Sequence, residues 1–130
     1  MGYMRHHAII VTGQRAYNTQ EVDHYELAHA KAVEFFGAQV SPMMPTVNNN
    51  FSSFFIGSDG SKEGWKDSDE GDARRATFVG YLRSASVSGA FLKWVEVQYG
   101  DEDDHNTVVN ASGYGRDEET DEDWVGFGRK

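Results

Sequence analysis

The densest grouping of chemically versatile side chains lies in residues 57–75, around the expected start of a helix. A helix N-terminus presents unpaired N–H groups and a partial positive charge, so it can hold an anion. Lysine and neighbouring arginines add charge and a bidentate fork for phosphate or carboxylate, and an indole can stack on a base. The segment therefore predicts a ligand-contacting loop, formed by Lys62, Glu63, Trp65, Arg74 and Arg75.

The same segment also allows a purely structural interpretation. Asp67, Asp69, Glu70 and Asp72 already bring negative charge to that helix start, where acidic side chains are stabilising. In this alternative the helix caps itself, and Trp65 holds the loop against the core without any ligand.

A second candidate surface lies on the last predicted strand, residues 91–99. Side chains of a strand alternate between two faces. The set Phe91, Val95, Val97 and Tyr99 is the predicted core face. The other set, which includes Trp94 and Glu96, is the predicted open face, and its side chains suit the binding of a small ligand. In the alternative, a second copy of the chain or the C-terminal tail covers this face.

The histidines do not predict a metal site. His6 and His7 are adjacent, so on a strand they point to opposite faces, and His24 and His29 lie about 140° apart around a helix. A metal needs ligands that converge at about 2.1 Å. We therefore predict no metal, no cofactor and no assigned catalytic residue. A small enzyme with His6 or His7 as acid/base beside Glu96 remains an alternative.

Charge divides the chain into two parts. The formal net charge is −9, yet residues 1–99 carry only −2 of it and residues 100–130 carry −7. Blocks of like charge stay solvated. The prediction is a nearly neutral domain over residues 1–100 and an acidic, extended or flexible tail over 101–130. An acidic mimic of DNA that inhibits a nucleic-acid-binding protein is an alternative function for such a tail.

Composition excludes several classes of function. An acidic chain is a poor binder of duplex nucleic acid or of anionic membranes, because both require cationic side chains. The absence of cysteine excludes disulfides and thiolate chemistry. No apolar run is long enough for a membrane span or a signal-peptide core.

Hydrophobic patterning predicts six elements within residues 3–100. Strands are expected at 5–12, 38–43, 51–56 and 91–99, and helices at 19–36 and from about 67 to 84, with a loop at 85–90. Asn18 and Glu21 have the spacing of a capping box, and Gly37 suits a left-handed helix end. The order β-α-β-β-α-β is that of the ferredoxin-like fold, a four-stranded antiparallel sheet with both helices on one face.

Five short runs within residues 4–101 carry a resemblance to a known group: MRHHAIIVT (4–12), VSP (40–42), SFFIGSDGSKEGW (53–65), DARR (72–75) and WVEVQYGD (94–101). They resemble small accessory proteins encoded by tailed bacteriophages, a group without an assigned activity. The resemblance implies a phage product that acts in the host bacterial cytoplasm on a host or defence component.

The function expected from the sequence is therefore that of a non-catalytic binding protein, expected to form a homo-oligomer such as a dimer. Its target is either a protein or a small anionic, nucleotide-like signal. For such a signal, Lys62, Arg74 and Arg75 would bind phosphate, and Trp65 or Trp94 would stack on the base.

Overall fold

β1 (His6–Gln14) is the central strand of a five-stranded antiparallel sheet. The computed structural model describes residues 4–87, 92–100 and 106–112. β1 pairs with β3 (Phe51–Ile56) on one side and with β4 (Leu92–Tyr99) on the other. The short β2 (Met44–Pro45) and β5 (Thr107–Ala111) form the two edges, which gives the strand order β2-β3-β1-β4-β5.

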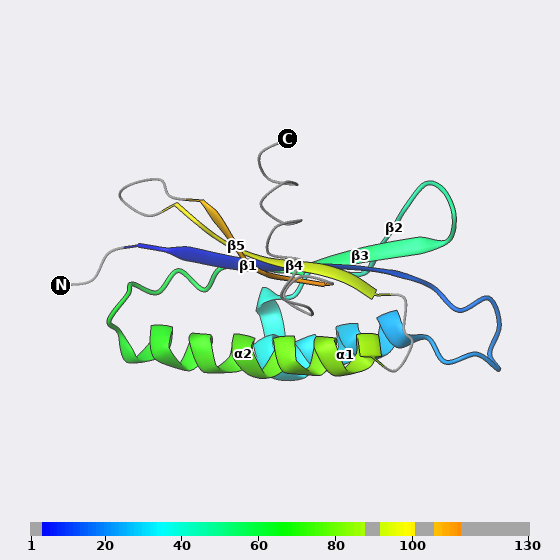
Figure 1. The fold of residues 1–130 in the computed structure, drawn as a ribbon, viewed down its shortest axis with the longest axis horizontal. Coiled ribbons are helices and arrows are strands. Elements are labelled where there is room, and N and C mark those ends of the chain that lie inside the picture. Colours follow the sequence, from blue (N-terminus) through cyan, green and yellow to red (C-terminus); the bar gives the residue numbers. More distant parts are fainter. Residues whose placement is uncertain (1–3, 88–91, 101–105, 113–130) are drawn as a thin grey trace, which may run out of the picture.

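Two helices, α1 (His24–Phe36) and α2 (Lys66–Val87), lie on the same face of this sheet (Figure 1). Alternate residues of the central strands point toward the helices and are buried, as the period of two in a strand requires. They pack against the inner faces of both helices to form one core, which includes Ile9, Val11, Tyr25, Ala28, Ala32, Phe36, Phe54, Ile56, Phe78, Leu82, Leu92 and Trp94.

The predicted mixed α+β class and the single antiparallel sheet are confirmed, but the sheet has five strands rather than four. The additional strand β5 lies inside the range predicted as a tail, so that prediction is wrong for Thr107–Ala111. β5 pairs with β4 across a register shift between Glu96 and Val97. The remaining residues of the predicted tail, 101–105 and 113–130, lie outside the described residues.

Helix α1 begins five residues later than predicted. Its N-cap is Asp23, whose side chain accepts a hydrogen bond from the backbone N–H of Glu26. Asn18 and Glu21 do satisfy backbone donors, at Gln20 and Tyr17 respectively, but they do so in a separate turn before the helix. The capping-box spacing therefore identified a local turn and misplaced the helix start.

The strand predicted at 38–43 is also displaced. A short 3-10 helix, Gly37–Gln39, follows α1, and a single bridge joins Val40 to Ile56 before β2 begins at Met44. Gly37 has a positive φ of 58°, but its ψ of −124° is not that of the left-handed helical end that the sequence predicted. The second predicted helix is confirmed as α2, which continues three residues past the predicted end at Ser84.

The predicted assignment of the two faces of β4 is wrong. Trp94 pairs with Val11 and Glu96 pairs with Ile9, and residues directly opposite each other in a sheet share a face. Val11 and Ile9 are both buried under the helices, so Trp94 and Glu96 are buried with them. Val95, Val97 and Tyr99 consequently belong to the face without helices, and Phe91 lies outside the described residues.

Candidate functional site

A cluster of charged side chains is buried between α2 and β4. Arg75 and Glu96 are only 8% and 6% exposed, and Arg75 Nε lies 3.7 Å from Glu96 Oε2. Arg75 also donates a hydrogen bond from Nη2 to Asp72, one turn earlier in α2. A buried charge without a counter-charge is strongly destabilising, so these pairings are what allow Arg75 and Glu96 to lie inside the protein.

Glu96 is connected further, to the edge strand. Asn110 of β5 donates a hydrogen bond from Nδ2 to Glu96 Oε1 at 2.9 Å, and it accepts one from Arg83 Nη2 at 2.9 Å. The Arg83 guanidinium lies 5.1 Å from the centre of the Trp94 ring. The charged cluster therefore ties α2 to both β4 and β5.

His7 enters the same cluster from β1. Its Nε2 lies 3.7 Å from Glu63 Oε2, and neither ring nitrogen has a hydrogen-bond partner among the described residues. Burial of the ring, followed by the nearby positive charge of Arg75, lowers the pKa of His7 below its ordinary value. The imidazole is therefore neutral at pH 7, which is the form that a general base requires.

Catalysis at this cluster would also require a place for a substrate. None of the three cavities described below is lined by His7, Glu63 or Glu96. Proton transfer requires the reacting group to come within hydrogen-bond distance of the base. The contacts of the cluster do hold the two layers of the fold together.

The predicted ligand loop is divided by the structure. Lys62, Trp65 and Arg74 remain at the surface, where Lys62 Nζ lies 5.9 Å from the centre of the Trp65 ring. Trp65 is 49% exposed, so it does not hold the loop against the core. A shallow cavity of about 220 Å³ lies here, lined by Asp59, Gly60, Ser61, Trp65, Asp67 and Arg74.

Carboxylates reduce the attraction of this shallow cavity for an anion. Asp59 and Asp67 both line it beside the single cation Arg74. Burial alone would raise the pKa of Asp59, but hydrogen bonds from Ser61 and the charges of Arg75 and Arg74 lower it, so its carboxyl is ionised at neutral pH. The site is thus not the cationic pocket that the sequence predicted.

Of the other predicted site residues, Arg75, Trp94 and Glu96 are buried and Glu63 is partly buried. Arg75 and Glu96 are paired with each other, Glu63 faces His7, and Trp94 is 4% exposed beneath Arg83. Burial and intramolecular partners thus disfavour the predictions that Arg75 binds phosphate and that Trp94 stacks on a ligand. The structure brings Glu63, Arg75 and Glu96 together, but as parts of the buried cluster.

The face of the sheet opposite the helices carries no described element (Figure 1). Four large apolar side chains on it, one from each of four strands, are 39–45% exposed: Ile10, Met44, Phe55 and Tyr99. Between them lie half-buried apolar residues and one polar pair, Thr12 and Ser53, whose hydroxyls are hydrogen-bonded at 2.7 Å. We call this surface the open sheet face; it comprises His6, Ala8, Ile10, Thr12, Gln14, Met44, Phe51, Ser53, Phe55, Lys93, Val95, Val97, Tyr99, Val108 and Ala111.

Sequence reasoning missed these residues because it assigned Val95, Val97 and Tyr99 to the core. The signal that identifies them is the pairing of β4 with β1, which places Val95 opposite Ile10 and Val97 opposite Ala8. Both faces of β4 are apolar in sequence, so alternation alone does not show which one the helices cover.

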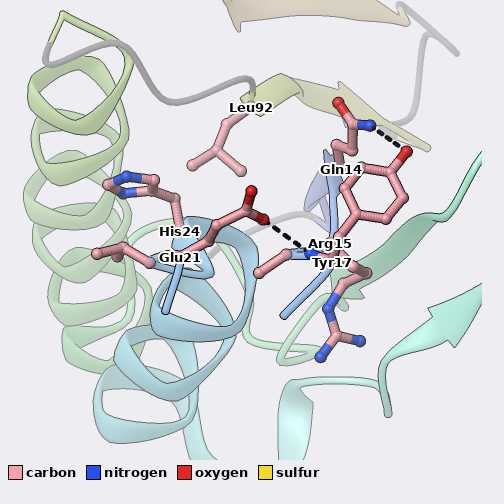
Figure 2. Close-up of a pocket in the computed structure, with 8 residues that line it drawn as sticks. Gln14, Arg15, Tyr17, Glu21, His24 and Leu92 are labelled. Carbon is pink, nitrogen blue, oxygen red and sulfur yellow. Dashed lines mark hydrogen bonds between the residues drawn. The ribbon is translucent and has the colours of Figure 1, made fainter. Parts of the chain in front are cut away.

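A cavity of about 320 Å³ lies where β1 leads into α1 (Figure 2). In it, Gln14 donates a hydrogen bond to the Tyr17 hydroxyl, and the backbone N–H of Tyr17 donates to Glu21. Leu92 of β4 and His24 of α1 complete its wall. A larger groove of about 690 Å³ shares Ala16, Tyr17, Glu21 and Val22 with this cavity and continues along α1.

Arg15 organises the loop beside this groove. Its Nε donates to Asp23 Oδ2 at 2.7 Å, and its Nη2 lies 3.6 Å from Glu26 Oε1. Burial would raise the pKa of Asp23, but the hydrogen bonds from Arg15 and from the N–H groups of Glu26 and Ala16 lower it. The Asp23 carboxylate therefore both caps α1 and fixes the loop.

Within residues 4–87, 92–100 and 106–112, no group of three His, Asp or Glu side chains could hold a metal ion. The helices of the described part include none that is long and apolar enough to cross a membrane. Comparisons of the chain with protein-family models, with curated proteins and with solved structures found no match.

Proposed function

We propose that the protein is a non-catalytic binding protein whose open sheet face engages an apolar surface of a protein partner. The observation that supports this proposal is the exposure of Ile10, Met44, Phe55 and Tyr99 together on one face of the sheet. A contiguous exposed apolar patch marks an interaction surface, since water contact with such a patch is unfavourable.

A protein is favoured over a small anionic ligand as the target. Two of the groups expected to recognise a nucleotide, Arg75 and Trp94, are buried and have intramolecular partners. The open sheet face instead offers aliphatic and aromatic side chains with a hydrogen-bonded hydroxyl pair, the composition of the core of a protein–protein interface.

The phage origin of the protein and its relationship to the ferredoxin-like fold are also part of the proposal. The resemblance to tailed-phage proteins makes a host or defence protein in the bacterial cytoplasm the natural partner. The strand order β2-β3-β1-β4, with both helices on one face, supports a ferredoxin-like fold to which β5 is added. In such a fold the sheet face without helices is free to bind.

The test compares the open sheet face with an equally exposed apolar site elsewhere. Ile10 is 44% exposed on the open sheet face, and Val33 is 45% exposed on α1. Tagged wild-type chain, Ile10→Thr/Phe55→Thr and the control Val33→Thr are used to capture partners from infected cells. Native mass spectrometry identifies what each chain retains, and the Kd is then measured with the purified partner.

We expect to capture a host or phage protein that binds the wild type and Val33→Thr equally. It should bind Ile10→Thr/Phe55→Thr at least about tenfold more weakly, because truncating the apolar side chains buried at the centre of an interface removes most of the binding energy. Equal binding to all three chains would contradict the proposal. So would a bound small molecule, or a homodimer that dissociates in the double variant, because the latter assigns the open sheet face to a second copy.

A further inference from the structure

The groove along α1 is lined in part by exposed apolar side chains. Tyr17, Val22 and Leu27 line it and are 69%, 61% and 53% exposed, and Ala16 and Ala30 continue the apolar surface. An exposed apolar groove next to a helix is a recurring site for a short peptide segment. This surface is distinct from the open sheet face, because it lies in the helix layer.

The charged residues that line the groove are all acidic: Glu21, Asp23 and Glu26. Arg15 is paired with Asp23 and lies near Glu26, which leaves Glu21 without a cationic partner among the described residues. The groove therefore combines a net negative charge with exposed apolar side chains. The segment that complements it carries large apolar side chains followed by cations.

Residues 124–130 of this chain have that chemistry. Their sequence is WVGFGRK, three large apolar residues followed by Arg129 and Lys130, and the acidic run before them ends at Asp123. The open sheet face is the poorer match for these cations, because its only charged member is Lys93.

The described part of the chain ends at Ser112, beside β4, and β4 begins at Leu92 in the wall of the cavity that adjoins the groove. Ser112, just after β5, donates from its N–H to the Trp94 carbonyl at 2.8 Å. Leu92, two residues before Trp94, lines the cavity of Figure 2 together with Tyr17. The twelve residues that follow Ser112, up to and including Trp124, span up to roughly 40 Å when extended, which exceeds the length of about 20 Å expected for a helix of 13 residues such as α1.

We infer that residues 124–130 dock into this groove within the same chain, with the Trp124 and Phe127 side chains on Val22, Leu27 and Ala30. Arg129 and Lys130 pair with Glu21 and Glu26 at the rim. Tethering raises the effective concentration of the segment to the millimolar range, so a weak contact is sufficient to hold it.

Because the full chain has no cysteine, a single label can report this contact. A nitroxide on Gly128→Cys broadens amide resonances near it. We expect at least about threefold stronger broadening at Leu27 and Ala30 of the groove than at Ile10 and Phe55 of the open sheet face. A mixture of labelled chain with isotope-labelled, nitroxide-free chain detects any contact between molecules.

The two matched variants each remove two glutamate charges, one pair inside the groove and one pair outside it. In Glu21→Gln/Glu26→Gln the broadening of the groove should fall at least about threefold, whereas Glu34→Gln/Glu70→Gln, which changes exposed acids outside the groove, should leave it unchanged. Broadening confined to the open sheet face, broadening seen only between molecules, broadening insensitive to Glu21 and Glu26, or none at all would overturn the inference.

Discussion

At the scale of single residues, His7 is a side chain whose pKa is lowered by its environment in the fold. It is held neutral in a buried position beside Arg75, and neither of its ring nitrogens has a hydrogen-bond partner among the described residues. Protonation would place a second positive charge near Arg75, although Glu63 lies within 3.7 Å to offset part of it. The neutral ring is therefore the form compatible with the native packing.

A dependence of stability on pH follows from this environment. The native pKa of His7 lies below its unfolded value of about 6.5, so the unfolded chain binds the proton more readily. The contribution of His7 to stability is complete above pH 6.5 and is lost as the pH falls toward the lowered native pKa. Urea denaturation at pH 7.5, 6.5 and 5.5 should show the free energy of unfolding decreasing with acidity, with a smaller decrease for His7→Gln. An identical slope for the two chains would contradict this role.

At the scale of elements, the start of α1 depends on Asp23. Its carboxylate accepts hydrogen bonds from Glu26 N–H, from Ala16 N–H and from Arg15, so one side chain serves both the helix and the preceding loop. Asn18, in contrast, accepts only from Gln20 and Glu21 in an exposed turn. In sequence the two residues are equally good candidates for an N-cap, but in the structure only Asp23 caps α1, whereas Asn18 stabilises the exposed turn before it.

We therefore expect Asp23→Ala to destabilise the protein by about 1–2 kcal/mol, the upper range for loss of an N-cap, because Arg15 also loses its partner. Asn18→Ala should cost about 0.5 kcal/mol or less, since it loosens only a surface turn. Thermal or urea denaturation of both variants measures the difference. A larger effect for Asn18→Ala would mean that the helix effectively starts where the sequence pattern placed it.

At the scale of the whole molecule, the buried cluster joins the helix layer to the sheet. Arg75 belongs to α2, Glu96 to β4 and Asn110 to β5, so one network crosses three elements. Because the partners are far apart in sequence, their interaction contributes only when the complete fold has formed.

Breaking this network should destabilise the protein in a non-additive way. Arg75→Met leaves Glu96 buried without its cation, and we expect a cost of about 3 kcal/mol, within the range measured for one partner of a buried ion pair. Adding Glu96→Gln removes the uncompensated charge while keeping a hydrogen-bond partner for Asn110, so the double variant should be less unstable than the two single effects combined. Urea denaturation of all four chains forms the double-mutant cycle, and strict additivity would contradict the coupling.

The extent to which the sequence predicted this molecule depends on the range of the interactions concerned. β1, β3 and α2 were predicted close to their observed positions, because strand alternation and helix periodicity are local patterns. The sequence did not predict which face of β4 the helices cover, because its two faces are similarly apolar, with Leu92 and Trp94 on one and Val95 and Val97 on the other. Only the pairing with β1 decides between them.

The same distinction applies to the candidate sites. Lys62 and Trp65 are exposed and Arg74 is partly exposed, and Trp65 and Arg74 line the same shallow cavity, since these residues are close in sequence. The burial of Arg75 depends on Glu96, 21 positions later, so residue type alone suggested an exposed phosphate ligand. The sequence did not predict the groove, because Tyr17 and Val22 were expected near or inside the start of a helix. In the structure they belong to a loop beside α1.

The edge strand β2 limits how these molecules can associate. It is only two residues long, and one of them is Pro45, which has no N–H to donate to a neighbouring strand. An exposed sheet edge otherwise acts as a template for strands of other chains, and short, proline-containing edges suppress such ribbon-like growth. A protein that exposes apolar side chains on its sheet is thereby protected from polymerising through its β2 edge, and contacts there are restricted to side chains.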